Sequence, residues 1–339
     1  MKTFKTALIG CGRIGFSLGF DKKREQPASH TVALFKNKKI NLVAAADTNE
    51  KSLIKWKKFA KKNKSPAFTF SKSDELYEKI KNIEIIVIAV NEQSHLEECL
   101  KAIHYKPRLV ILEKPVALNS SEGKIIEGEA QKNGVCVMVN HERRFDKNYE
   151  KAKSLLSKIG TIQNVKGELD SGLRVYHKDF EKDGTYSLLH DGTHLVDIIN
   201  FLFEVELKNP LVTNIFYDEK KVVRNFTALY STQKIPEIQI KMSGRSRFFE
   251  FRIEILGTEG KIVVGNGIFE FYLRKESSLY TGFYSLKKQK IKLPKRSEYF
   301  SGMVQNAVDF LEGKSELKSP LNDALNDLKI LEEIKAKFE

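Results

Sequence analysis

A glycine-rich turn close to the start of the chain constrains the fold more than any other feature. An apolar run from Ala7 to Ile9 leads directly into the pattern G-x-G-x-x-G, which predicts a strand, a tight turn and a helix in that order. The turn needs a residue without a Cβ at its bend, and the helix N-terminus that follows attracts phosphates. Glycines also occur in ordinary turns, but the flanking pattern favours a dinucleotide site. The candidate cofactor-binding residues of this turn are Gly10, Gly12, Arg13, Ile14 and Gly15.

An acidic residue ends the second predicted strand, at 42–47. In dinucleotide-binding folds an acid at this place binds the ribose hydroxyls, usually about 20 residues after the glycines. Asp47 lies 32 residues after the last glycine, and a polar surface insertion at 21–29 would account for the excess. The alternative is that Asp47 caps the next helix, at 50–62. An acid here repels a 2′-phosphate, which favours NAD, while Lys51 nearby keeps NADP open.

Three further apolar runs, at 83–90, 107–112 and 135–139, have the length and continuity of buried parallel strands. Because helical segments alternate with them, they predict a doubly wound parallel sheet, a Rossmann domain over residues 1–140. Ligands of such sheets bind beyond the carboxyl ends of the strands. The polar residues that follow these strands are therefore further cofactor-binding candidates: Asn91, His95, Glu113, Lys114 and Asn140.

The composition is that of a globular protein of about two domains, with 339 residues, 41% of them hydrophobic and 30% charged. The net charge of +14 raises the question of nucleic acid. However, the lysines are scattered along the chain, and the densest run, 55–64, has the pattern of a solvated helix face. We therefore rank nucleic-acid binding last and expect no nucleic-acid partner. The positive field instead favours an anionic cofactor or substrate.

The cysteines and apolar runs bear on location. The three cysteines show no metal-binding spacing, which indicates a reducing compartment and a cytoplasmic protein. No apolar run approaches the roughly 20 residues that span a membrane, and no membrane partner is expected.

Four segments together resemble the Gfo/Idh/MocA oxidoreductases, the glucose–fructose oxidoreductase and inositol dehydrogenase family. Besides the glycine turn, these are Glu113-Lys114-Pro115, Asn140 with Arg144-Phe145, and Gly192-Thr193-His194 with Asp197. The resemblance implies a Rossmann domain followed by an α/β domain, here 141–339, with a large open, mainly antiparallel sheet that often forms a dimer face. It also implies hydride transfer between NAD(P) and a carbinol carbon of a sugar, cyclitol or sugar nucleotide. A homo-oligomer, dimer or tetramer, is expected.

The same resemblance assigns the acid/base role to Lys114, assisted by His194. Oxidising an alcohol removes a hydride from carbon and a proton from oxygen, and a lysine amine near the nicotinamide can take that proton. The alternatives are a lysine that pairs with an acid at a strand end, and a histidine that belongs to the core. A cofactor-binding regulator of the same fold without turnover is the alternative function.

The chain departs from the family pattern next to His194. The family usually carries an acid four residues before this histidine, but here that position is His190 and the acid follows as Asp191. In a helix, His190 and His194 share a face, so His190 is a third catalytic candidate. No metal is expected, because no further ligand group stands out and the resembled family uses none.

The second half also supplies substrate-binding candidates, some of which could equally be loop residues. They are Lys114, Arg174, Tyr176, His177, His190, Asp191 and His194. Alternation predicts strands with one buried face, carrying Ile238, Ile240, Met242, Phe249, Phe251, Ile253 and Ile255. The C-terminal helix, after Ser319-Pro320, could pack back on the first domain.

Overall fold

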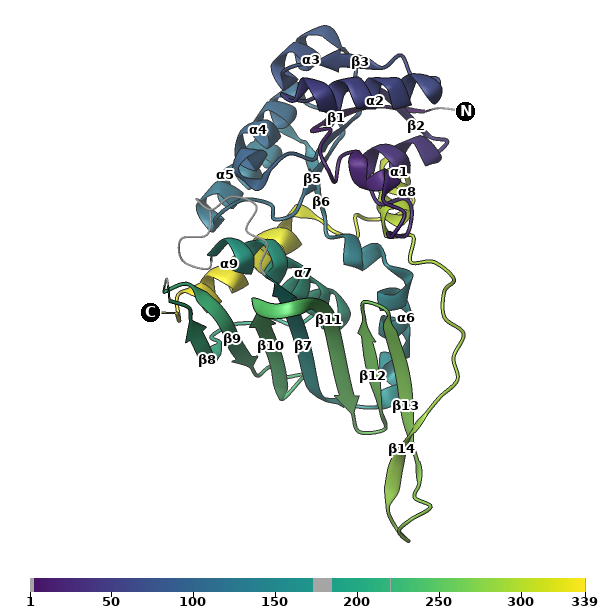
Figure 1. The fold of residues 1–339 in the computed structure, drawn as a ribbon, viewed down its shortest axis with the longest axis vertical. Helices are drawn as coiled ribbons and strands as arrows, with labels where there is room; N and C mark the ends of the chain where they lie inside the picture. Colours follow the sequence, from purple (N-terminus) through teal and green to yellow (C-terminus); the bar gives the residue numbers. More distant parts are fainter. Residues whose placement is uncertain (1–2, 173–184, 220, 339) are drawn as a thin grey trace. The chain divides into compact units, whose positions relative to one another are not determined.

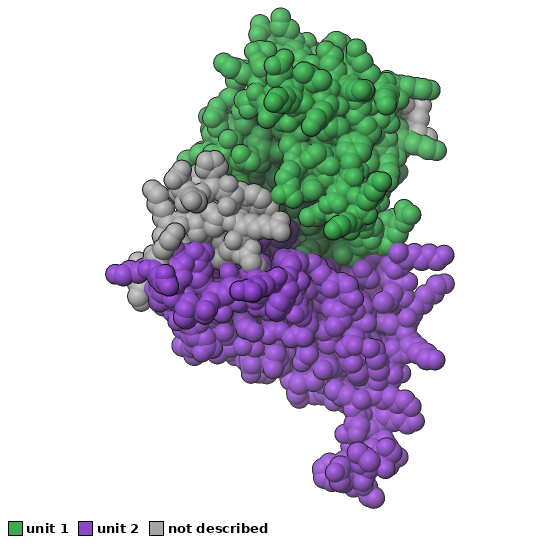
Figure 2. Space-filling model, viewed as in Figure 1, with its two compact units in different colours: residues 1–146, 296–328 green, residues 147–295, 329–339 purple. Residues whose placement is uncertain are grey.

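A computed structural model describes residues 3–172, 185–219 and 221–338 (Figure 1). The chain divides into two compact units, coloured separately in Figure 2. Unit 1 comprises residues 1–146 and 296–328, and unit 2 comprises 147–295 and 329–339. The division therefore falls after Asp146 rather than after residue 140, and residues 296–328, expected in the second domain, belong to unit 1. No helix among the described residues is long and apolar enough to cross a membrane.

The sheet of unit 1 has six parallel strands in the order β3-β2-β1-β4-β5-β6, which confirms the predicted doubly wound sheet. Its strands are β1 (Phe4–Ile9), β2 (Ile40–Ala46), β3 (Phe68–Phe70), β4 (Ile85–Ile88), β5 (Leu109–Glu113) and β6 (Cys136–Asn140). Its helices are α1 (His30–Lys36), α2 (Glu50–Lys62), α3 (Ser73–Lys79), α4 (His95–Tyr105), α5 (Ser120–Asn133) and α8 (Tyr299–Leu311). Buried side chains of α1, α2 and α8 join those of the strands in one apolar cluster.

The helix expected directly after the glycine turn is interrupted. Only one turn forms, and the chain then leaves it for residues 16–29, which include a short 3-10 helix, η1 (Ser17–Phe20). The helix resumes at α1, where His30 N–H and Thr31 N–H donate to the carbonyl oxygens of Ile14 and Gly15 at 3.0 and 2.9 Å. The insertion is thus longer than the expected 21–29, and it explains the distance between the glycines and Asp47.

The insertion is also fastened to the last segment of unit 1. The Glu25 carboxylate accepts hydrogen bonds from the backbone N–H groups of Ser297 and Glu298 at 3.1 and 2.8 Å, at the start of α8. N–H groups at a helix N-terminus have no partner within the helix, so an acid there stabilises the helix. The insertion therefore helps to hold α8 in the unit 1 core.

Unit 2 is built on an eight-stranded sheet in the order β14-β13-β12-β11-β7-β10-β9-β8. Every pairing is antiparallel except β7 with β10, so the mainly antiparallel sheet is confirmed. Its strands are β7 (Ile162–Gly172), β8 (Leu211–Tyr217), β9 (Val223–Tyr230), β10 (Glu237–Ser243), β11 (Arg245–Gly257), β12 (Gly260–Gly265), β13 (Ile268–Glu276) and β14 (Tyr284–Lys288). The helices are α6 (Lys147–Leu155) and α7 (Thr185–Phe203); α9 (Leu321–Lys335) begins in unit 1 and ends in unit 2.

One face of this sheet is buried, as the alternation predicted. Gly167 of β7 lies so close to α7 that a Cβ there would come within 3.0 Å of the Leu195 side chain. Ile238, Ile240 and Met242 are buried, as are Phe251, Ile253 and Ile255. Phe249 is the exception, because the register of β11 shifts between Arg245 and Glu250 and leaves Phe249 56% exposed.

Candidate active site

The glycine loop is fastened to the end of β2 by one carboxylate. Cys11 N–H donates to Asp47 Oδ2 at 2.6 Å, and Asn49 N–H donates to Asp47 Oδ1 at 2.7 Å. The cap of α2 is Asn49, whose side-chain oxygen accepts from Ser52 N–H at 3.1 Å. Asn49 therefore fills the capping role considered for Asp47, and Asp47 lies at the loop, where the ribose-binding prediction needs it.

The three glycines of the loop are required for different reasons. Gly10 has a φ of +96°, and a Cβ there would overlap the Ala89 carbonyl oxygen. A Cβ on Gly15 would overlap the carbonyl oxygen of Gly10. A Cβ on Gly12, by contrast, would meet no described atom within 4 Å. The fold thus explains Gly10 and Gly15, while the open space at Gly12 fits the close approach of a pyrophosphate.

Glu113, at the end of β5, is the centre of a buried polar network. Its Oε1 accepts from Asn140 Nδ2 at 2.7 Å and lies 2.6 Å from His30 Nε2. Burial alone would raise the pKa of Glu113, but the hydrogen bonds from His30 and Asn140 and the charge of Lys114 hold that pKa below its ordinary value. Glu113 is therefore an ionised carboxylate directly beside Lys114 in the chain.

His30 supplies the first of these hydrogen bonds and is fully buried. Its ring packs edge-on against Phe300 of α8, with centroids 5.1 Å apart. His30 Nδ1 has no hydrogen-bond partner among the described residues, and the ring contacts Glu113 through Nε2. No sequence pattern marked this residue as a site residue, because the insertion separates it from the glycine turn.

His95 supports the same turn from the other side. Its Nδ1 lies 2.7 Å from the Pro115 carbonyl oxygen, and its Nε2 lies 3.3 Å from the Val90 carbonyl oxygen. Burial lowers the pKa of His95, against the effect of these carbonyls, so the neutral ring donates from Nδ1 to Pro115. This geometry favours a supporting role for His95 over direct cofactor contact. Asn91, in contrast, is exposed after β4.

Lys114 is half-buried beside this network. A second acid, Glu142, is close enough to feel the charges of Glu113 and Lys114. Burial raises the pKa of Glu142, and the negative charge of Glu113 adds to this, against the opposing charges of Arg143, Lys114 and Arg24. Glu142 is a titratable neighbour of Lys114 that the sequence did not single out.

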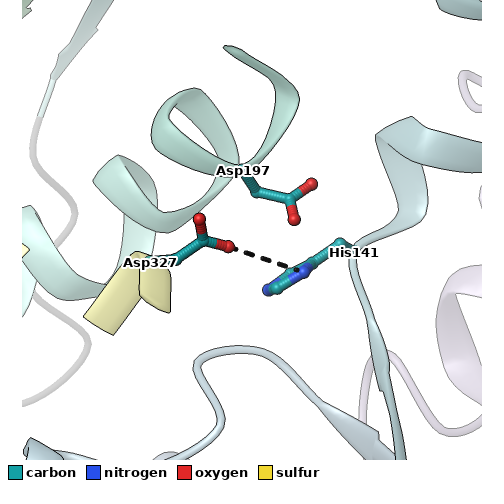
Figure 3. Close-up of side chains that lie close together, drawn as sticks. All are labelled: His141, Asp197 and Asp327. Carbon is teal, nitrogen blue, oxygen red and sulfur yellow. Dashed lines mark ion pairs between the residues drawn. The ribbon is translucent and has the colours of Figure 1, made fainter. Parts of the chain in front are cut away.

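A buried acid–histidine pair lies just beyond β6. Figure 3 shows the ring of His141 facing Asp327, with Nδ1 and Oδ2 3.8 Å apart and both side chains buried. The Ser319 hydroxyl lies 3.3 Å from the same nitrogen. The sequence predicted neither His141 nor Asp327. Asp197, the third side chain drawn, belongs to unit 2, where it is a buried carboxylate on α7.

The histidine segment of unit 2 is helical, as expected. His190, Asp191 and His194 all lie on α7, half-buried, and His190 and His194 are four residues apart on one face. The Ser171 hydroxyl lies 3.5 Å from Asp191 Oδ2. Gly192 is needed for packing, since a Cβ there would come within 3.0 Å of Leu331 and 3.2 Å of Met242 Sδ.

The candidates thus fall into two groups. Unit 1 brings together the glycine loop with Asp47, and Glu113 with Asn140; unit 2 brings His190, Asp191 and His194 onto one helix. Arg174, Tyr176 and His177 lie outside the described residues. The juxtaposition of Lys114 with His194 stays a prediction.

Sequence comparison finds a family model that matches the first part of the chain. Residues 4–141 match the model of an oxidoreductase family with an NAD-binding Rossmann fold. The chain is 30% identical to a Bacillus subtilis (strain 168) scyllo-inositol 2-dehydrogenase (NADP(+)) over 127 residues, which is 36% of this chain and 35% of that protein. It is 26% identical over 247 residues to the glucose-6-phosphate 3-dehydrogenase of the same organism, covering 68% of this chain and 64% of the relative. The chain thus covers about a third of the length of the inositol dehydrogenase and under two thirds of the length of the glucose-6-phosphate dehydrogenase.

Solved structures share the whole fold at low sequence identity. A putative NADPH-dependent oxidoreductase from Desulfitobacterium hafniense DCB-2 superposes with a TM-score of 0.81 at 15% identity, covering 100% of this chain and 96% of that one. An Agrobacterium radiobacter oxidoreductase in complex with NAD+, L-tartaric acid and magnesium gives 0.77 at 19% identity, covering 100% and 98%. Residues 4–141 are thus similar to the Gfo/Idh/MocA oxidoreductases, whose NAD-binding Rossmann model they match.

Proposed function

We propose that the protein is an NAD(P)-dependent dehydrogenase or reductase that acts on a carbinol carbon of a sugar, cyclitol or sugar nucleotide. The observation that carries the proposal is the fixed Glu113–Pro115 turn. Glu113 is held from one side by His30 and Asn140, and Pro115 from the other by His95. The backbone of Lys114 is therefore held on both sides, which is the preorganisation that an acid/base group needs.

The residues present fit a dinucleotide. Gly12 leaves space for a close approach to its backbone, and Asp47 offers a carboxylate at the end of β2. A bound nicotinamide would accept or supply the hydride. The Asp47 charge favours NAD over NADP, since it would repel a 2′-phosphate.

The protein's own residues would then handle the proton. When the alcohol is oxidised, the Lys114 amine takes the hydroxyl proton, and in the reverse direction the ammonium group returns it to the carbonyl oxygen. His194 would hydrogen-bond the reacting hydroxyl, and His190, one helical turn away, would contact a neighbouring hydroxyl in place of the family's usual acid. The scyllo-inositol 2-dehydrogenase and the glucose-6-phosphate 3-dehydrogenase among the relatives support a polyhydroxylated substrate.

The test is a substitution that removes only the proton carrier. Lys114→Met should bind NADH as the wild type does, measured by cofactor fluorescence, but lose turnover by at least a thousandfold with any substrate found in a screen of aldoses, cyclitols and sugar nucleotides. Lys124→Met, on the exposed side of α5, is the matched control and should keep full activity. Turnover that survives Lys114→Met removes the mechanism. Cofactor binding without turnover on any substrate would favour the regulator instead.

We also propose that the protein is a homo-oligomer that associates through the open face of the unit 2 sheet. This face carries charged pairs, among them Glu168 with Arg252 and Lys241. Paired charges of both signs on one surface suit a self-complementary contact.

A further inference from the structure

The strands β13 and β14 form a hairpin that continues beyond the rest of the unit 2 sheet. β12 pairs with β13 only as far as Leu273, opposite Gly260. From Arg274 to Glu276, β13 pairs with β14 alone. Figures 1 and 2 show this hairpin projecting from unit 2. A two-stranded ribbon gains little stability by itself in water, so a projecting one calls for a binding partner.

The tip of the hairpin has a defined conformation that exposes large apolar side chains. Ser277 N–H donates to the Phe283 carbonyl oxygen at 2.8 Å, and the Ser277 hydroxyl accepts from Leu279 N–H at 3.1 Å. The exposed fractions of the tip side chains are 79% for Leu279, 66% for Tyr280, 67% for Phe283 and 62% for Tyr284. So many neighbouring exposed apolar groups mark an interaction surface.

Charge is segregated along the hairpin. The ten residues 277–286 contain no charged side chain. Apart from the exposed acid Glu276, the charged residues on either side are basic and exposed: Arg274, Lys275, Lys287, Lys288, Lys290, Lys292, Lys295 and Arg296. Among the described residues, Lys287, Lys290, Lys292 and Lys295 form no ion pair with an acid. The hairpin thus has an uncharged apolar tip, while Arg274 and Lys288 near its base pair with Glu259 and Glu270. The unpaired lysines are Lys287 of β14 and Lys290, Lys292 and Lys295 of the segment that follows β14.

This arrangement fits an anionic lipid surface better than other partners. A second copy of the chain carries the same net charge of +14, and acids on its sheet are already paired, as in Glu254 with Lys261 and Glu270 with Lys288. Nucleic-acid grooves interleave aromatic and basic groups, whereas here the two kinds are separated and Leu279 cannot stack on a base. At a membrane surface, aromatic and aliphatic side chains enter the interface while lysines stay at the anionic headgroups.

We propose that residues 277–286 insert into the surface of an anionic lipid bilayer, and that the lysines from Lys287 to Lys295 hold the hairpin there. The contact is peripheral, since a hairpin tip enters only the headgroup region, and it needs no spanning helix. It is independent of the proposed reaction, because none of these residues is a candidate for the active site.

The experiment is co-sedimentation of the full-length protein with vesicles of phosphatidylcholine, with and without phosphatidylglycerol. The wild type should pellet with the anionic vesicles only, and less so as salt is raised. Leu279→Ser with Phe283→Ser should lower the affinity at least tenfold. Replacing Lys287, Lys290 and Lys292 by Gln should lower it about fivefold per lysine, the factor equivalent to about 1 kcal/mol.

Two matched control variants replace the same types of side chain, an exposed leucine and exposed lysines, at other places on the surface. Leu211→Ser removes an exposed leucine from β8, and Lys57→Gln with Lys58→Gln removes exposed lysines from α2; both should bind vesicles as the wild type does. In a Tyr280→Trp variant, the fluorescence emission of the new tryptophan should shift to the blue when anionic vesicles are added. The one native tryptophan, Trp56, is buried, so its emission should not change on vesicle binding.

Three outcomes would overturn the proposal. One is failure of the wild type to pellet with anionic vesicles. Another is unchanged vesicle binding by the Leu279/Phe283 variant, when circular dichroism shows it folded. The third is a tip variant that changes the molar mass in light scattering while vesicles remain unbound, which would assign the hairpin to a contact between copies.

Discussion

Replacing Asn140 by Leu tests whether the Glu113 carboxylate is held ionised by its buried donors. The substitution keeps the side-chain volume nearly constant but removes the 2.7 Å hydrogen bond to Oε1. A hydrogen bond to a charged group contributes about 1.5–3 kcal/mol, and the same change removes Asn140 Oδ1, a buried acceptor without a partner among the described residues, whose burial costs about 1 kcal/mol. We therefore expect a net loss of about 0.5–2 kcal/mol in the free energy of unfolding of unit 1 at pH 7.

The expected loss depends on pH in one direction. The pKa of Glu113 is lowered in the folded protein, so its contribution to stability is present above the unfolded pKa of about 4.3 and is lost as pH falls through the lower folded pKa. The cost of Asn140→Leu should therefore be constant from pH 7 to about 5 and shrink as the pH falls below about 4.

Urea unfolding followed by tryptophan emission is the assay. Trp56 is the one tryptophan, it is buried in the unit 1 core, and its Nε1 donates to Thr31 Oγ1 at 3.1 Å, so its emission reports on unit 1. The matched measurement is Asn140→Leu in a Glu113→Gln background, where the hydrogen bond is no longer charge-assisted and the cost should fall by about half. An equal cost in both backgrounds, or a cost that grows on acidification, would refute the ionised carboxylate.

Two further predictions concern the cofactor loop. Gly12→Ala should fold with wild-type stability, because its Cβ meets no described atom, yet bind NADH at least tenfold more weakly, whereas Gly10→Ala, with its positive φ and its overlap with Ala89, should lose about 2 kcal/mol or more of stability in urea. Wild-type NADH affinity in Gly12→Ala would contradict the placement of the pyrophosphate. Asp47→Asn keeps a side-chain oxygen of the same reach for Cys11 N–H but removes the charge, so the ratio of NADP to NAD affinities should rise about tenfold in fluorescence titrations. An unchanged ratio would mean that Asp47 does not face the ribose.

The sequence was sufficient to predict which residues lie at the carboxyl edge of the parallel sheet. Parallel strands bring their carboxyl ends to the same edge, whatever path the connecting segments take. Glu113 and Asn140, 27 residues apart, are for that reason in direct contact. The match to the oxidoreductase family model and the two sheets were likewise predictable, since the motifs and the alternation are local patterns.

What could not be predicted depends on contacts between distant segments. His30 reaches Glu113 across 83 residues, and no periodicity marks it, because the insertion breaks the helix pattern that would have placed it. Phe249 fits the alternating pattern of buried residues, but the register of β11 shifts and leaves Phe249 exposed. No sequence pattern marks that shift. The pKa of Glu142 is raised mainly by burial and further by the charge of Glu113, and both depend on tertiary packing that the sequence alone does not show.

The path of the chain between the units has a consequence for biosynthesis. The core of the first unit includes Phe300, Val304 and Val308 of α8 alongside Leu8 and Trp56 from the opening segments. The ribosome makes the strands of the parallel sheet first, yet the helix that completes their apolar layer is made only after all the strands of the antiparallel sheet. Part of the apolar interior of the Rossmann unit therefore stays exposed to solvent during synthesis. The antiparallel sheet, although it is made later, can fold before the Rossmann unit is complete.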